Sequence, residues 1–113
     1  MVNQNKFQIL QNECSNCVKC SLSSTRNNVV FGRGNPHSKL FVIGEGPGQQ
    51  EDEQGLAFVG RAGKMLDSAF LSVGIDTNKD CYISNIVKCR PPNNRKPLAN
   101  EVKECMPWLN EQI

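Results

Sequence analysis

The cysteines of this 113-residue chain are the residues best spaced for chemistry, because thiolates bind metal ions and iron–sulfur clusters. Cys14, Cys17 and Cys20 follow one another at intervals of three residues and form two overlapping C-x-x-C pairs. Cys89 and Cys105 would complete a set of four if the C-terminal segment folds back towards the N-terminus. Four thiolates hold either a zinc ion or an iron–sulfur cluster.

The spacing alone leaves the type of centre open. A zinc ribbon usually carries a second C-x-x-C pair, and the later cysteines of this chain form none. One or two cysteines could also be ordinary buried thiols, for which Cys14 and Cys81 are the best candidates.

A second chemical feature is the glycine-rich stretch Gly44–Gly48, in which three glycines and a proline exclude the interior of a helix or strand. Its spacing departs from the dinucleotide fingerprint, and the three acids Glu51–Glu53 would repel phosphates. With the carboxylate of Glu45 and the isolated aromatic ring of Phe58, the stretch predicts a pocket for a neutral planar ligand such as a base. Loop bracing by Glu45 and core packing by Phe58 are the structural alternatives.

Asn85 lies in an apolar stretch, where a buried amide must satisfy both a donor and an acceptor. It can accept from one ligand atom and donate to the next. This pattern matches N3–H and O4 of uracil, whereas cytosine presents the reverse pattern. The loop that follows, residues 88–97, carries Lys88, Arg90 and Arg95 and no acid. This composition is typical of phosphate contacts, and equally of a solvated surface.

Hydrophobic periodicity predicts the elements that must position these residues. We expect helices at 3–13, 61–73 and 98–113, strands at 40–43 and 81–87, and a short edge strand at 29–31. A strand, a helix and a second strand with a long crossover give parallel strands in a right-handed unit. Ligands of such α/β sheets bind beyond the carboxyl ends of the strands, where Gly44–Gly48 would lie. Pro107 is expected to kink the last helix.

Composition favours one small globular domain. Hydrophobic residues make up 38% of the chain and charged residues 21%, and the net charge is +2. No apolar run approaches the ~20 residues of a membrane helix, and the first residues do not form a signal peptide. We expect a monomeric, cytoplasmic protein without a membrane partner.

These motifs together resemble the family 4 uracil-DNA glycosylases, the iron–sulfur type of bacteria and archaea. The segments that match in order and spacing are Cys17–Leu22, Val29–Pro36, Gly44–Asp52, Phe58–Gly63, Tyr82–Pro97 and Cys105. The resemblance implies a three-layer α/β/α fold with a small parallel sheet. Residues 1–113 would form the N-terminal part of a single glycosylase domain, because the family's later strands and histidine motif have no match here. We therefore expect little activity from these residues alone, and His37 does not match that motif.

For cofactor and substrate, the resemblance implies a 4Fe–4S cluster and uracil-containing DNA, single- or double-stranded. The implied cluster ligands are Cys17, Cys20, Cys89 and Cys105. The implied site residues are Glu45 as a catalytic carboxylate on the water and sugar side, Gly44, Gly46, Phe58 and Asn85 around uracil, and Lys88, Arg90 and Arg95 on DNA. One departure is Ala57, which stands where the family usually has proline before the stacking phenylalanine.

The implied reaction is hydrolysis of the N-glycosidic bond of deoxyuridine in base excision repair, which leaves an abasic site. Two other functions remain open from the sequence. One is a non-catalytic iron–sulfur DNA-binding module, and the other is a glycosylase-like domain associated with a phage-type DNA polymerase.

Overall fold

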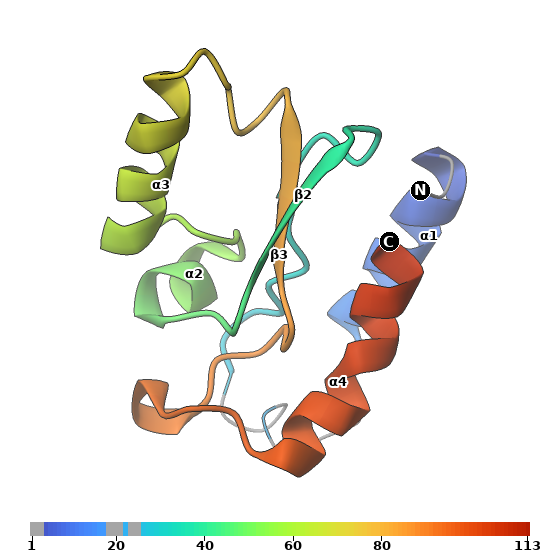
Figure 1. The fold of residues 1–113 in the computed structure, drawn as a ribbon. Helices are drawn as coiled ribbons and strands as arrows, with labels where there is room; N and C mark the ends of the chain where they lie inside the picture. Colours follow the sequence, from blue (N-terminus) through green and yellow to red (C-terminus); the bar gives the residue numbers. More distant parts are fainter. Residues whose placement is uncertain (1–3, 18–21, 23–25) are drawn as a thin grey trace.

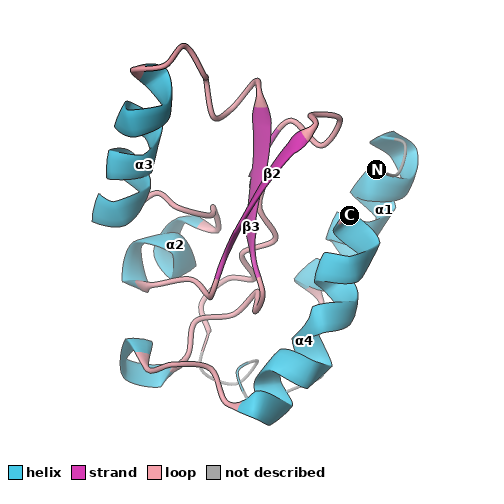
Figure 2. Cartoon of the chain, viewed as in Figure 1, coloured by secondary structure: helices cyan, strands magenta, loops and turns pink. Residues whose placement is uncertain are grey.

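The computed structural model describes residues 4–17, 22 and 26–113, and it forms three layers (Figure 1). The helices α2 (Gln49–Gln54) and α3 (Arg61–Leu71) cover one face of a sheet. The helices α1 (Gln4–Ser15) and α4 (Ala99–Gln112) pack together on the other face (Figure 2). The α/β class and the three-layer arrangement are therefore confirmed.

The sheet contains β1 (Arg33–Gly34), β2 (Leu40–Gly44) and β3 (Cys81–Asn85) in the order β1-β3-β2. The strands β2 and β3 are parallel, with Gly44 opposite Asn85, as the crossover predicts. The expectation of a wholly parallel sheet is wrong, because β1 pairs antiparallel with β3.

The edge strand also begins later than the predicted 29–31. Gly34 adopts φ +110°, and a Cβ there would collide with the carbonyl oxygen of Cys81, so this glycine permits the close pairing of β1 with β3. Val30 instead donates one backbone hydrogen bond to the carbonyl of Lys88, at 2.7 Å.

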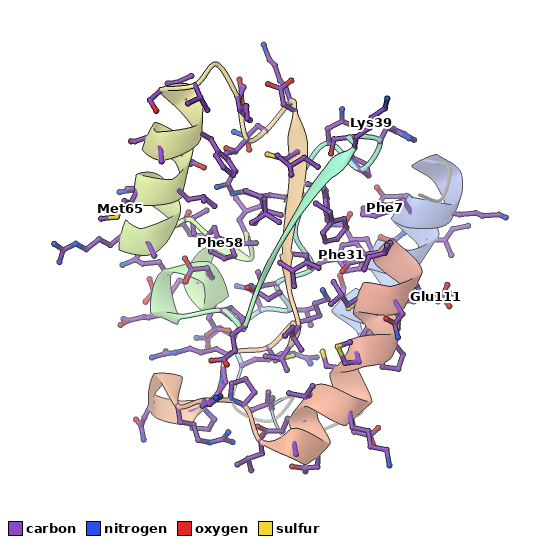
Figure 3. All side chains as sticks on the ribbon, viewed as in Figure 1. Phe7, Phe31, Lys39, Phe58, Met65 and Glu111 are labelled. Atoms are coloured by element: carbon purple, nitrogen blue, oxygen red, sulfur yellow. The ribbon has the colours of Figure 1, made fainter. Side chains whose placement is uncertain are left out.

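Neighbouring residues of β3 supply the two halves of the core, because side chains alternate across a strand. Tyr82 packs with Phe7 and Phe31 below α1 and α4, at ring-centroid distances of 5.1 Å for Phe7–Tyr82 and 5.4 Å for Phe7–Phe31. Ile83 packs on the other face with Val30 and Ala57. Figure 3 shows Phe7 and Phe31 on the α1–α4 side and Phe58 on the α2–α3 side.

The helix predicted at 61–73 is found as Arg61–Leu71, but its buried stripe is narrower than its periodicity predicts. Met65 and Val73 follow the helical spacing of the apolar residues, yet their side chains are 67% and 71% exposed. Only Gly63 is fully buried, because the first turn of the helix packs against the backbone of Phe58. Figure 3 shows Met65 on the outer side of α3.

The terminal helices are close to their predicted ranges. Residue 3 lies outside the described residues, so the first helix is seen from Gln4 to Ser15. The last helix continues through Pro107 to Gln112, and it buries Cys105 and Leu109. It also buries two polar side chains that periodicity did not indicate, Glu101 and Gln112. None of the described helices has the length and apolar composition to cross a membrane.

Candidate active site and cysteine site

The carboxyl ends of β2 and β3 border a pocket of about 110 Å³. Its lining consists of Gly46, Glu51, Phe58, Ala62, Gly63 and Asn85. A cavity of about 150 Å³ in another protein holds one benzene molecule, so the size here is that of a single small ring. The sequence predicted three of these lining residues, and the strand register brings Gly44 beside them.

Asn85 is 2% exposed, and its Oδ1 atom has no hydrogen-bond partner among the described residues. Leaving a buried acceptor unpaired costs about 1–3 kcal/mol, so such an atom is typical of a site that a ligand donor completes. Gly44 leaves space for this atom because glycine has no Cβ. A Cβ at Gly44 would lie 2.5 Å from Asn85 Oδ1 and would collide with the ring of Phe58.

Phe58 is half-buried and has φ +54°, in the left-handed region that residues with a side chain seldom adopt. Gly63 in the first turn of α3 packs directly against its backbone, and a Cβ at that position would collide with the Phe58 carbonyl. Arg33 donates to the carbonyl oxygens of Ala57 and Phe58, at 2.6 Å and 3.1 Å. Two neighbouring elements thus fix the loop that carries the ring.

Glu51 holds the next turn of this loop. Its carboxylate accepts from the backbone N–H of Gly48 at 2.9 Å, Val59 at 3.0 Å and Gly60 at 2.6 Å. In the sequence, Glu51 stands out only as one of three successive acids that would repel phosphate, and this bracing role is not evident from that pattern. Its place at the third position of a helix after a glycine is a capping-box position, which could have indicated it.

Glu45 is exposed and lines a second hollow of about 110 Å³ beside the first. Gly46 borders both hollows, and Pro91 and Arg95 border the second. The structure therefore brings Gly46, Phe58 and Asn85 together and places Glu45 at the adjoining hollow. His37, the only histidine of the chain, is exposed in the loop between β1 and β2.

Lys88 of the basic loop was expected to contact DNA, but the structure places it inside the fold. Lys88 is 1% exposed, because its side chain turns inward beneath α4. Its Nζ donates to Ser84 Oγ at 2.5 Å, to the Asn85 carbonyl at 2.7 Å and to Gln112 Oε1 at 2.6 Å. Burial lowers the pKa of this ammonium to about 8. Lys88 is thus a buried structural residue, and DNA cannot reach its charge.

The two arginines of this loop lie nearer the surface. Arg90 is half-buried. Arg95 forms two hydrogen bonds of 2.8 Å to the fully buried carboxylate of Glu101, while about a third of its side chain (36%) stays exposed. This bidentate pair ties the loop to the first turn of α4.

Three of the four predicted cluster ligands lie where α1, the basic loop and α4 converge, and each sulfur accepts a hydrogen bond. Trp108 Nε1 donates to Cys17 at 3.3 Å and Arg26 Nη1 donates to Cys89 at 3.2 Å. The backbone N–H of Lys88 donates to Cys105 Sγ at 3.1 Å. Cys20 lies outside the described residues. Within the described part of the chain, no three His, Cys, Asp or Glu side chains are grouped to hold a single metal ion.

The two remaining cysteines are buried. Cys14 packs among Phe7, Phe31 and Tyr82, and burial raises the pKa of its thiol to about 12. Cys81 is fully buried at the start of β3.

Comparison with known proteins agrees with this geometry. The family model "Uracil DNA glycosylase superfamily" matches residues 31–113, and the chain belongs to this superfamily. It is 45% identical to the type-4 uracil-DNA glycosylases of Pyrobaculum aerophilum, over 95% of the chain and 54% of the relative, and of Archaeoglobus fulgidus, over 89% and 50%. The resemblance to family 4 is thereby confirmed, and the chain spans about half the length of these relatives. A DNA polymerase of Bacillus phage SP01 is 34% identical over 73% of the chain and 9% of the polymerase.

Proposed function

We propose that residues 1–113 form the N-terminal part of a uracil-DNA glycosylase domain, which removes uracil from DNA and leaves an abasic site. The observation that carries the proposal is the unpartnered Oδ1 atom of Asn85, buried beside Phe58 at the ends of two parallel strands. An enzyme that acts on a base must take it out of the stack and read its edge in a pocket.

In this proposal Asn85 reads the uracil edge. Its Oδ1 accepts from N3–H and its amide nitrogen donates to O4, whereas cytosine offers no N3–H at neutral pH. Phe58 stacks on the base, and the backbone N–H groups of Gly44 and Gly46 help to hold O2 as negative charge develops there. Glu45 faces the sugar side, where its carboxylate stabilises the developing positive charge or orients the attacking water.

We further propose a 4Fe–4S cluster bound by Cys17, Cys20, Cys89 and Cys105. Three of these sulfurs, those of Cys17, Cys89 and Cys105, belong to described residues and lie where α1, the basic loop and α4 converge. The N–H donors on all three sulfurs also fit, since hydrogen bonds to sulfur stabilise bound thiolates. When bound, the cluster would join the end of α1 to α4 and hold the loop of Arg90 and Arg95 against DNA.

The proposal is tested with the natural protein that contains this segment. An oligonucleotide with one deoxyuridine, single- or double-stranded, should break at that position after alkaline treatment, and an oligonucleotide with thymidine there should stay intact. The Asn85→Ala variant should lose most of this activity. Full activity in that variant, or none in the unaltered protein, would overturn the proposed function.

A second candidate is a glycosylase-like domain attached to a DNA polymerase, which the match to the phage polymerase favours. The higher identity to the type-4 enzymes supports the first proposal. DNA synthesis by the natural protein would favour the polymerase, and tight DNA binding without uracil excision would favour a non-catalytic iron–sulfur module. We propose a monomeric cytoplasmic protein in each case.

A further inference from the structure

Arg33 of β1 lies behind the loop that carries Phe58, and the function proposed above assigns it no role. Its side chain is 9% exposed. Nε donates to the Ala57 carbonyl at 2.6 Å, and Nη2 donates to the Phe58 carbonyl at 3.1 Å. The guanidinium thus binds two successive carbonyls at the one point where the pocket wall has a left-handed backbone.

The same guanidinium is fixed from the other side. Nη1 donates to Asn78 Oδ1 at 2.9 Å and to Thr77 Oγ1 at 3.2 Å, and Nη2 pairs with Asp67 Oδ1 of α3 at 2.8 Å. All three nitrogens of Arg33 are therefore engaged, and the group cannot shift without breaking bonds to α3 and to the loop before β3.

The backbone of Phe58 requires such a restraint. A phenylalanine at φ +54° is disfavoured by its own Cβ, so the conformation persists only where surrounding groups hold it. With the 57 and 58 carbonyls turned towards Arg33, the ring of Phe58 lines the pocket beside Asn85. Relaxation to a right-handed backbone would redirect both carbonyls and swing the ring.

We propose that Arg33 is a positioning residue for base stacking: it fixes the backbone of Phe58 so that the ring stays over the base-binding pocket. This inference rests on the proposed function, because it assigns Phe58 to stacking. Arg33 does not touch the base, so it acts entirely through Phe58.

The test is a double-mutant cycle in the natural full-length protein with its cluster, using Arg33→Met, Phe58→Ala and the double variant. A misplacement of about 1 Å can cost ~100-fold in rate, so Arg33→Met should lower kcat/KM for uracil excision by about 10- to 100-fold. The double variant should be no slower than Phe58→Ala, because the two residues act as one unit. Binding of an oligonucleotide without uracil should stay unchanged.

Asp67→Ala is the matched control. It removes the ion partner of Arg33 and leaves both bonds to the loop carbonyls, so kcat/KM should fall by less than in Arg33→Met, although the fold loses stability because the nearly buried guanidinium loses its counter-ion. If Arg33→Met does not fold, Arg33→Lys replaces it in the same cycle.

Two outcomes separate this inference from the proposed function. If Phe58→Ala and Arg33→Met each reduce activity and their fold-losses multiply in the double variant, Arg33 acts independently of Phe58 and the inference is wrong, while the glycosylase proposal stands. If Phe58→Ala retains full activity on uracil, the stacking role fails and the inference fails with it.

Discussion

The pocket and the cysteine site are held in different ways. Around the pocket, side chains bind backbone: Arg33 holds two carbonyls, Glu51 holds three N–H groups, and Gly44 leaves space for Phe58 and Asn85. Around the cysteines, a buried network of side chains surrounds the ammonium of Lys88. The pocket therefore depends on local backbone shape, and the cysteine site on keeping every buried polar group paired.

Lys88 also connects the two regions. Its ammonium binds the carbonyl of Asn85, and its backbone N–H binds Cys105 Sγ. Gln112 completes the network by donating to the Phe31 carbonyl at 2.8 Å. Damage at the cysteine site should thus reach the base-reading strand, whereas damage in the pocket should leave the cysteine site intact.

The largest expected effect comes from removing a predicted cluster ligand. Cys105→Ala should reduce bound iron and sulfide to near zero and abolish visible absorption, because a missing thiolate leaves one iron without its protein ligand. Cys81→Ala, a change at another buried thiol, should keep the full cluster. Anaerobic purification with iron, sulfide and zinc analysis measures this. One zinc and no sulfide in the unaltered protein would contradict the cluster.

The next effect tests the buried network. Lys88→Met should destabilise the fold by about 2–4 kcal/mol, because the acceptors on Asn85 and Gln112 lose their donor inside the protein. Chemical denaturation measures it, with Lys103→Met at an exposed position of α4 as the control. Equal stability in the two variants would mean that the ammonium is not buried as described.

Asn85→Asp acts on the pocket alone. The carboxylate only accepts, so it loses the donor to O4 and can accept from the amino group of cytosine. Uracil excision should weaken and rejection of cytosine should relax by roughly 1–3 kcal/mol, as for a bidentate base contact. Excision rates on uracil and cytosine oligonucleotides measure this change, and Asn110→Asp on the exposed side of α4 is the control. Unchanged uracil activity would show that Asn85 does not read the base. Loss of iron from Asn85→Asp would show that damage in the pocket also reaches the cysteine site.

The smallest effect concerns Arg90. Arg90→Gln should weaken binding to DNA with or without uracil to a similar degree. It should also reduce the slope of log affinity against log salt by about 0.7–0.9, the value for one phosphate contact. Lys88→Met should leave this slope unchanged, since its charge lies inside the fold. A reduced slope in Lys88→Met together with an unchanged slope in Arg90→Gln would reverse our assignment of the two cations.

Local patterns predicted the parallel strands and the first and last helices, because residues close together in the sequence form an apolar run or a helical stripe. They also predicted Phe58 and Asn85, since an aromatic among polar residues and an amide among apolar ones stand out. Arg33 and Lys88 could not be recognised as structural. Ala57 lies 24 residues from Arg33 and Gln112 lies 24 residues from Lys88, and no local spacing records these contacts.

Exposed Leu40 and Ile43 have a consequence for the handling of residues 1–113 by themselves. In the described sheet β2 pairs with β3 on one side only, and these two side chains are 40% and 46% exposed. The unpaired backbone groups of an exposed edge strand can hydrogen-bond to a strand of another chain, and neighbouring apolar side chains favour this pairing. Produced without further sequence, this polypeptide should therefore self-associate through β2 as its concentration rises, and a peptide that adds a strand at that edge should keep it dispersed.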